Sequence, residues 1–378
     1  MKRINHCRVC HHEFFETPLF RYENMPKSAQ NFPDAASLGN DKGIDLEVCQ
    51  CSGCGIVQLS NDPVPYYREV IRAAAFSEEM KQFRLHQFEQ FAHRYSLENK
   101  KIIEIGCGRG EYLSLMKKFI AQAYGIEYSP VSVNLCKESG LKVQQGYIDA
   151  EKFILQDAPF NAFFILSFLE HMPDINTALR GIAHNLTDDA VGLIEVPNFD
   201  MILRKNLFSE FISDHLFYFT AETLSSLLAV NGFQVLECKA VWHDYILSAV
   251  VRKRRPVDMS DFSGFQSKLK DELFEFIGRH QDVAIWGAGH QALTVISLAG
   301  LSGKIKYVVD SAPFKQNKYT PASHIPIVAP EMLRANKVDA VIIMAAAYSD
   351  EIAGFLMNKY SKEIAIAILR DYGLEKIN

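Results

Sequence analysis

The middle of the chain alternates short apolar runs with stretches in which apolar residues recur every three or four positions. KIIEIG (101–106) and AYGIEYS (123–129) are compact apolar runs, whereas YLSLMKKFI (112–120) and VSVNLCKESG (131–140) follow the wider spacing. The first pattern is typical of strands and the second of helices. Their alternation predicts an α/β fold, with a doubly wound, Rossmann-like parallel sheet covered by helices on both faces.

The same alternation returns near the C-terminus. SKLKDELFEFIGRH (267–280) has an amphipathic helical pattern, and the strand-like runs VAIWG (283–287) and KIKYVVDS (304–311) follow it. These segments predict a helix followed by two strands.

Three domains are expected from these patterns and from a length of 378 residues, since domains average about 150 residues. The charged stretch VVRKRRPVD (250–258) contains a proline and is typical of a solvated linker. The predicted division is an N-terminal module over 1–65, a central domain over 66–253 that opens with a helix over 66–95, and a C-terminal domain over 254–378.

Composition narrows the class of protein. The chain is 48% hydrophobic and 22% charged, which is ordinary for a globular protein. Its formal net charge of −5 gives no overall attraction for nucleic acid or for an anionic membrane. No apolar stretch approaches the roughly 20 residues that span a bilayer, and the first residues, MKRINHC, lack an apolar signal core. We expect a cytoplasmic protein with reduced cysteines and no membrane partner.

Five of the eight cysteines lie within the first 54 residues. Two C-x-x-C pairs, Cys7 with Cys10 and Cys51 with Cys54, can each direct two thiolates at one ion. Four sulfur ligands suit a structural Zn²⁺ ion without an open coordination position. Cys49 is a further sulfur, which leaves the ligand set open. The alternatives are a thioredoxin-like redox pair, unrelated buried cysteines and a zinc ribbon that binds nucleic acid.

The segment EIGCGRG (104–110) places three alternating glycines after a predicted strand that carries Glu104. Dinucleotide-binding turns read G-x-G-x-x-G, whereas this spacing with a preceding acid matches enzymes that use S-adenosyl-L-methionine. At Gly106, Gly108 and Gly110 the backbone can approach a cofactor without a Cβ in the way. The alternative is a tight strand-to-helix turn with no ligand.

Three further residues at strand ends are candidates for the same cofactor. Glu127 ends the next strand, where an acid can accept hydrogen bonds from ribose hydroxyls. Tyr147 follows the third strand, where an adenine pocket is expected, and Ser167 follows the fourth. Glu127 and Tyr147 also admit a purely structural reading, because acids and aromatic residues are common at such positions.

The C-terminal domain supports a rival hypothesis. Gly287, Gly289 and Ala292 fit G-x-G-x-x-A after a strand, and Asp310 ends the next strand. This is a fingerprint of NAD binding, so an oxidoreductase is the alternative enzyme class.

Several motifs together resemble the three-domain nucleotide-sugar C-methyltransferases. They are CRVC with CSGCGIVQL, EIGCGRG with FLEHMPD, DHLFYFT, and YVVDSAPFKQNKY with SHIPI, and they extend over nearly the whole length. The resemblance implies a zinc module, an S-adenosylmethionine-dependent domain and a second Rossmann-like domain that helps to bind the substrate without a redox cofactor. It also implies methylation of a ring carbon next to a keto group on a nucleotide-linked sugar.

The resemblance places a general-base histidine at His215, with Asp214 at the position of a family glutamate and Ile212 at that of a family tyrosine. Histidine suits this step, because its unperturbed pKa of about 6.5 lies near neutral pH. A structural histidine is the alternative. The family's Gly-Gly-Ser stretch is replaced by His243, Asp244 and Tyr245.

Further substrate contacts are expected at Tyr66 and Tyr67, which lead into the central domain and for which core packing is the alternative. Lys315 or His290 are expected as phosphate contacts. The acceptor, the methylated atom and the oligomeric state stay open. A methyltransferase acting on oxygen or nitrogen, and a degenerate one that only binds a glycan precursor, are the remaining alternatives.

Overall fold

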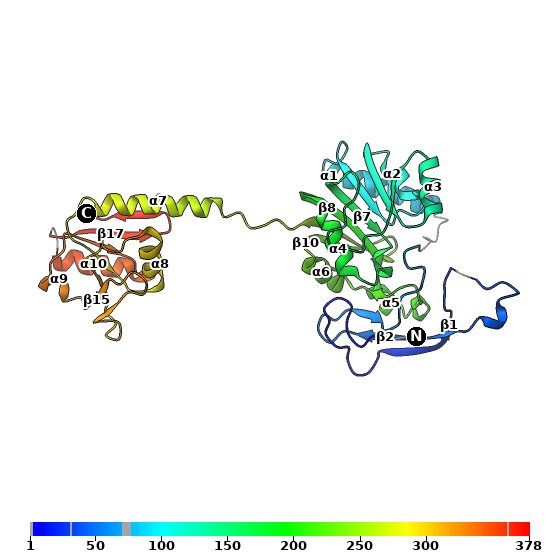
Figure 1. Cartoon of the computed structure of the whole chain (residues 1–378), viewed down its shortest axis with the longest axis horizontal. Coiled ribbons are helices and arrows are strands. Elements are labelled where there is room, and N and C mark those ends of the chain that lie inside the picture. The colour runs from blue at the N-terminus through cyan, green and yellow to red at the C-terminus, as the bar shows by residue number, and fades with distance from the viewer. Residues whose placement is uncertain (1–2, 31, 70–76, 361–362) are drawn as a thin grey trace. The chain divides into compact units, whose positions relative to one another are not determined.

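The computed structural model describes residues 3–30, 32–69, 77–360 and 363–378. The chain divides into two compact units, Met1–Arg255 and Pro256–Asn378, and each is described by itself (Figure 1).

The first unit contains a seven-stranded sheet in the order β10-β11-β8-β7-β4-β5-β6. Neighbouring strands from β8 to β6 pair in parallel, whereas β11 runs antiparallel to both β8 and β10. The strands are β4 (Lys101–Ile105), β5 (Gln122–Glu127), β6 (Lys142–Gln145), β7 (Phe160–Leu166), β8 (Leu186–Pro197), β10 (Phe233–Val241) and β11 (Ile246–Lys253).

Helices cover both faces of this sheet. One hydrophobic core joins the sheet to the first three helices, and another joins it to α4 and α6. The helices are α1 (Glu78–Arg94), α2 (Glu111–Met116), α3 (Pro130–Glu138), α4 (Ile175–His184), α5 (Phe199–Arg204) and α6 (Ala221–Val230), with the 3₁₀ turns η2 (Leu169–His171) and η3 (Phe208–Glu210). The α/β fold expected from the alternating pattern is therefore confirmed.

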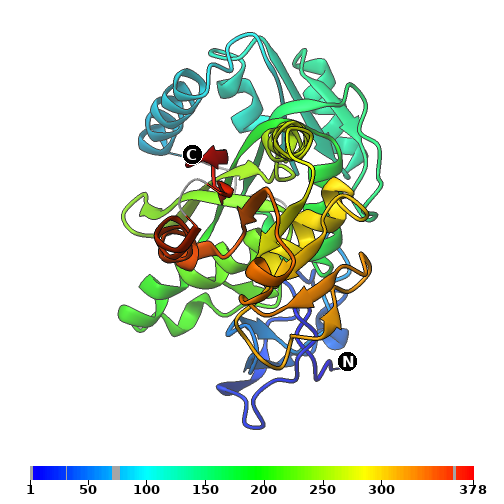
Figure 2. The same ribbon diagram turned by 90° about the vertical axis from the view of Figure 1, so that its left-hand side faces the viewer.

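The N-terminal strands form a second, four-stranded sheet in the order β1-β2-β3-β9. The first three are β1 (Phe20–Met25), β2 (Ile44–Gln50) and β3 (Val57–Leu59), with the 3₁₀ turn η1 (Leu38–Asn40) between β1 and β2. The fourth, β9 (Phe217–Tyr218), comes from the central part of the chain. In both views the blue N-terminal strands lie beside green segments of this unit (Figures 1 and 2).

The second unit is built around another seven-stranded sheet, in the order β14-β15-β13-β12-β16-β17-β18. The strands β15, β13, β12, β16 and β17 pair in parallel, and β14 and β18 are antiparallel edge strands. The elements are α7 (Ser260–Ile277), β12 (Val283–Trp286), α8 (His290–Ala299), β13 (Tyr307–Val309), β14 (Lys318–Tyr319), β15 (Pro326–Val328), α9 (Met332–Ala335), β16 (Ala340–Ile343), η4 (Ala346–Tyr348), α10 (Ser349–Tyr360), β17 (Ala365–Arg370) and β18 (Gly373–Lys376).

The helix expected over 66–95 is shorter than predicted. Residues 66–69 form a turn, 70–76 lie outside the described residues, and α1 begins at Glu78. Ser77 caps α1, because its side chain accepts a hydrogen bond from the amide of Met80. The periodic spacing of apolar residues over 66–69 was therefore misleading. Among the helices described, none combines the length and the apolar character needed to cross a membrane.

A buried ion pair holds α1 against the central sheet. Arg84 on α1 contacts Glu195 on β8, and their side chains are 1% and 0% exposed. Gln87, one turn further along α1, also donates to Glu195. Such a pair contributes little net stability, but losing one partner leaves a charge buried without compensation.

We predict that Arg84→Leu lowers the free energy of unfolding of this unit by about 3 kcal/mol, because Glu195 then loses its cation. Urea unfolding followed by circular dichroism measures the change. Arg94→Leu is the matched control, since Arg94 lies 3.5 Å from Glu237 with 61% of its side chain exposed. It should cost less than about 1 kcal/mol. Equal losses in the two variants would contradict the assigned role of the buried pair.

Candidate functional site

The turn after β4 depends on its glycines. Gly106, Gly108 and Gly110 all have positive φ angles, of 66°, 58° and 82°. A Cβ on Gly106 would lie 2.5 Å from a ring carbon of Phe168, and one on Gly110 would lie 2.3 Å from Leu141 Cδ1. Both backbone conformation and packing therefore demand glycine at these two positions.

The carboxylate of Glu127 borders this turn. Glu127 Oε2 accepts a hydrogen bond from the amide of Gly108 at 3.0 Å, and Oε1 accepts one from the amide of Ser129 at 2.9 Å. Glu104 lies on the neighbouring strand β4 and is fully buried. The two acids and the glycine turn thus meet at the carboxyl ends of parallel strands, which is where ligands bind in sheets of this kind.

An aromatic cluster lies next to Glu127. The ring of Tyr147 packs edge-on against Tyr67, with centroids 5.8 Å apart. The guanidinium carbon of Arg68 lies 5.2 Å from the ring centroids of both tyrosines and 5.6 Å from that of Tyr128. The sequence analysis did not identify Arg68 or Tyr128, because the cluster brings together three separate segments of the chain.

Ser167 follows β7 with a φ angle of 52°, and its amide donates to the carbonyl of Glu195 at 2.9 Å. The next residue, Phe168, packs against Gly106, against the ring of Tyr147 at 6.5 Å and against the ring of His171 at 6.4 Å. Phe168 therefore connects the glycine turn with the η2 turn.

His215 is positioned by the η2 turn. The Nδ1 atom of His171 lies 2.7 Å from the carbonyl oxygen of Asp214, and the amide of Leu216 donates to the carbonyl of Glu170 at 2.9 Å. These two bonds hold the backbone on either side of His215. The rings of His215 and His171 then meet edge-on, with centroids 4.8 Å apart.

Burial favours the neutral form of both imidazoles. Burial lowers the pKa of His171 to about 4. Burial and then the neighbouring His171 hold the pKa of His215 well below its ordinary value. Because the carbonyl of Asp214 is an acceptor, the proton of His171 lies on Nδ1 and its Nε2 carries a lone pair.

The side chain of Asp214 is directed toward Tyr66. Asp214 Oδ1 accepts a hydrogen bond from the Tyr66 hydroxyl at 2.9 Å, and Oδ2 accepts one from the amide of Ala29 at 3.1 Å. Burial raises the pKa of Tyr66, so its hydroxyl keeps its proton. The structure thus brings the predicted residues Tyr66 and Asp214 into contact, and His215 follows Asp214 in the chain.

The three residues that replace the family's Gly-Gly-Ser stretch form a tight turn bonded to neighbouring segments. His243 pairs with Glu79 at 3.0 Å, and the hydroxyl of Tyr245 donates to Glu210 at 2.9 Å. Asp244 forms an ion pair with Arg204.

Two cavities lie near Tyr66, and only the first is lined by the segment before His215. One of about 620 Å³ has a largely apolar lining that includes Phe32, Phe211 and Ile212. The other, of about 1020 Å³, is lined by Tyr66 together with Lys27 and Lys42. Sequence patterns alone gave no sign of either cavity.

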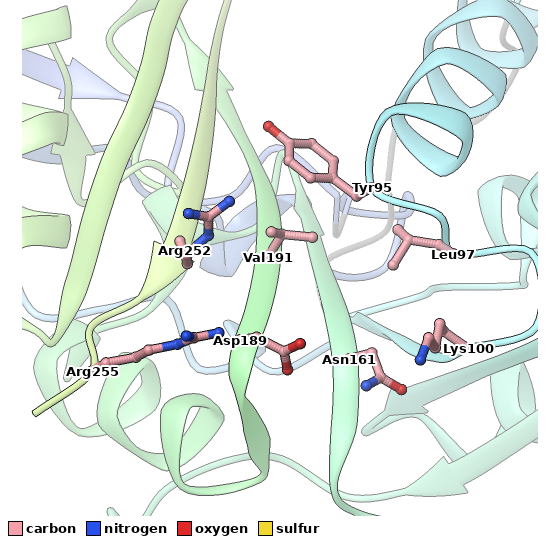
Figure 3. Close-up of a pocket in the computed structure, with 8 residues that line it drawn as sticks. All are labelled: Tyr95, Leu97, Lys100, Asn161, Asp189, Val191, Arg252 and Arg255. Carbon is pink, nitrogen blue, oxygen red and sulfur yellow. The ribbon is translucent and has the colours of Figure 1, made fainter. Parts of the chain in front are cut away.

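A third cavity, of about 340 Å³, lies at the opposite end of the sheet (Figure 3). Its lining includes Lys100, which precedes β4, and Asn161 and Asp189, which lie near the start of β7 and β8. Because ligands bind at the other ends of parallel strands, this cavity is not the predicted site.

The four N-terminal cysteines of the two C-x-x-C pairs converge. Cys7 Sγ lies 3.6 Å from Cys54 Sγ, Cys10 Sγ lies 3.3 Å from Cys51 Sγ, and all four sulfurs lie within 4.8 Å of one another. Sulfurs bound tetrahedrally to Zn²⁺ at about 2.3 Å would be about 3.8 Å apart, so the arrangement fits that ion.

Two contacts prepare this cluster to hold a cation. The amides of Val9 and Gly53 donate to Cys7 Sγ and Cys51 Sγ, each at 3.3 Å, which favours thiolates. Cys49 lies apart from the cluster on β2, with its Sγ 3.9 Å from Glu47, and burial and then Glu47 raise its pKa to about 11.

In the second unit, Gly287 has a φ angle of 113° and begins the turn before α8. Asp310 Oδ2 accepts hydrogen bonds from the amide of Ala288 and from Lys315 Nζ, at 2.8 and 2.9 Å. Lys315, a predicted phosphate contact, is therefore engaged in an ion pair within its own unit.

Known proteins share parts of this sequence. A family model described as a methyltransferase domain matches residues 72–238, and one described as a C-methyltransferase C-terminal domain matches residues 258–365. The chain is similar to C-methyltransferase NovU of Streptomyces niveus, at 20% identity over 93% of this chain and 92% of that protein. It also resembles a ubiquinone biosynthesis O-methyltransferase of Stutzerimonas stutzeri, at 35% identity over 23% of this chain and 40% of that protein.

Solved structures align with about half of the chain. A plantazolicin methyltransferase, BpumL, in complex with a substrate analogue and SAH, gives a TM-score of 0.39 at 16% identity over 47% of this chain and 87% of that one. An S-adenosylmethionine-dependent methyltransferase from Clostridium acetobutylicum gives 0.39 at 12% identity over 50% of this chain and 96% of that one.

We predict one tightly bound zinc ion per chain at the cysteine cluster. Cys10→Ser should lose this ion, because three thiolates and a hydroxyl form a weaker site, and elemental analysis after dialysis against a mild chelator measures the loss. Cys49→Ser is the matched control and should keep the ion. A dialysed chain without zinc, or an equal loss from both variants, would rule out the assigned ligands.

We also predict that Glu127→Gln weakens binding of S-adenosylhomocysteine about 10- to 100-fold, since bonds to a charged acceptor contribute about 1.5–3 kcal/mol. Titration calorimetry measures the dissociation constant. Glu138→Gln, at the end of the adjacent helix α3, is the control and should bind normally. Unchanged affinity in Glu127→Gln would show that its carboxylate does not contact the ligand.

Proposed function

We propose that this chain, which is an S-adenosylmethionine-dependent methyltransferase, methylates a carbon next to a keto group of a nucleotide-linked sugar, with His215 as general base. The observation that carries the proposal is the placement of His215. The η2 turn fixes the backbone on both sides of it, and Phe168 in the same loop packs against the glycine turn. A base is therefore held beside a cofactor site on the same edge of the sheet.

The cofactor site fits S-adenosylmethionine by the chemistry of its donors. Glu127 offers a carboxylate at the end of β5, and the tyrosines around Arg68 offer aromatic faces to an adenine ring. When bound, S-adenosylmethionine supplies a methyl group on a positively charged sulfur.

His215 would remove the proton from the acceptor carbon. An adjacent carbonyl makes this feasible, because the charge left behind spreads into an enolate. His215 would hold this proton while the carbon takes the methyl group that bound S-adenosylmethionine would supply, with S-adenosylhomocysteine as the leaving group. The backbone clamp around His215 keeps the base aligned during these events.

Tyr66 and Asp214 are suited to orient the acceptor. The Tyr66 hydroxyl is bound to Asp214, and Tyr66 also lines the cavity that contains Lys27 and Lys42. Lysine side chains bind phosphate groups, so in this proposal Lys27 and Lys42 contact the diphosphate of a nucleotide-linked sugar, although Asp41 and Glu69 line the same cavity. In this proposal, Tyr67 contributes to the mouth of the site.

A second candidate is O-methylation of an apolar acceptor. It is favoured by the 620 Å³ apolar cavity beside Ile212, which occupies the family's tyrosine position. A screen of 4-keto nucleotide-sugars and of phenolic acceptors, read by mass spectrometry, distinguishes the two. Methylation of phenols alone would replace the first proposal with the second.

We predict that His215→Asn lowers the turnover of a keto sugar by about 10²- to 10⁴-fold, the usual contribution of a general base. Affinity for S-adenosylhomocysteine should change less than about twofold. Exchange of the acceptor's carbon-bound proton with deuterated water should also stop, as nuclear magnetic resonance would show. His243→Asn, an exposed histidine, is the control. Wild-type turnover in His215→Asn would remove the base from the mechanism.

A further inference from the structure

Three metal-ligating side chains meet at the proposed base. Glu170, His171 and His215 each direct one ligand atom into a space where these atoms lie within 4.8 Å of one another. Two imidazoles and a carboxylate are a donor set for zinc and related divalent ions. We propose that these residues form a second, transition-metal site, separate from the cysteine cluster, and that an ion bound there inhibits the enzyme by occupying His215.

The orientation of His171 is that of a metal ligand. Its Nδ1–H donates to the carbonyl of Asp214 at 2.7 Å, which leaves Nε2 as the free ligand atom, 3.9 Å from Glu170 Oε1. Metal-bound histidines nearly always use their other nitrogen in this way, because the hydrogen bond fixes the ring and its tautomer.

The distances require only small side-chain movements. Ligand atoms about 2.0–2.2 Å from a tetrahedral ion lie about 3.3–3.6 Å apart. The separation of 3.9 Å between His171 and Glu170, and separations of up to 4.8 Å within the group, would close by about an ångström. During these side-chain movements, the hydrogen bond from the amide of Leu216 to the carbonyl of Glu170 keeps the backbone segments that carry the ligands together.

The three ligands differ in their exposure to solvent. Glu170 and His171 are 1% and 5% exposed, whereas His215 is partly exposed. An ion can therefore enter past His215 and retain a water molecule as its fourth ligand, since the protein provides three.

The inhibitory consequence rests on the proposed function. The nitrogen of His215 that binds the ion would be the one that accepts the proton from the acceptor carbon. Ion and proton then compete for a single lone pair, and methyl transfer stops while the ion is bound. Metal binding itself can be tested without any substrate.

The test is titration of the zinc-loaded, full-length chain with Co²⁺ under absorption spectroscopy. We expect one further equivalent of Co²⁺ with weak visible bands and no intense thiolate-to-cobalt band in the near ultraviolet. Glu170→Gln and His171→Asn should each weaken this binding at least about tenfold, whereas Cys49→Ser and His243→Asn should not. Affinity for S-adenosylhomocysteine verifies that each variant is folded.

The proposed metal site would be overturned if the chain bound no second equivalent of Co²⁺ at millimolar concentration, or if the only new band were a thiolate-to-cobalt band. Unchanged Co²⁺ binding in both Glu170→Gln and His171→Asn would overturn it as well. Once a keto sugar that accepts the methyl group is identified, its turnover should fall in proportion to the fraction of the second metal site that is occupied. Turnover should recover when a chelator removes that ion. Full turnover at saturation would overturn the inhibitory part. If no keto sugar is methylated, the proposed function fails while the Co²⁺ titration still decides the metal site.

Discussion

The pairing of β3 with β9 is the contact on which the site depends. Val57 and Gln58 pair with Tyr218 and Phe217, and the amide of Leu59 donates to the carbonyl of Leu216 at 3.0 Å. β9 begins two residues after His215, and β3 begins three residues after Cys54. A few backbone hydrogen bonds therefore connect the cysteine cluster to the segment that carries the proposed base.

Phe168 makes the second essential connection. Its ring fills the space that a side chain on Gly106 would need, and it also touches the rings of Tyr147 and His171. One loop after β7 thus contacts the glycine turn on one side and holds His215 on the other. The two halves of the proposed reaction are aligned by packing around a single aromatic ring.

The parts of the site that the sequence predicted are those whose local spacing identifies their chemistry, even where the partners lie more than 40 residues apart. The paired spacing of Cys7, Cys10, Cys51 and Cys54 anticipated their convergence in the structure. The glycine turn could also be anticipated, because strand, turn and helix are consecutive in the chain. Glu127 follows from the same rule, since adjacent parallel strands end at one edge of the sheet.

Other features depend on long-range convergence and left no local signal. The clamp of His171 on the backbone of Asp214 joins segments more than 40 residues apart, and the hydrogen bond from Tyr66 to Asp214 spans an even longer interval. Local periodicity predicted the helix that spans Glu78–Arg94 but not its start, which the N-cap at Ser77 sets. Topology, rather than residue type, determines these contacts.

The division into two units has a thermodynamic consequence. Each unit draws the strands of its sheets from its own residues and buries its own hydrophobic clusters, and the chain passes from one to the other once, between Arg255 and Pro256. Unfolding is cooperative within a shared hydrophobic core, so a side chain lost from one of these clusters first destabilises the unit to which that cluster belongs.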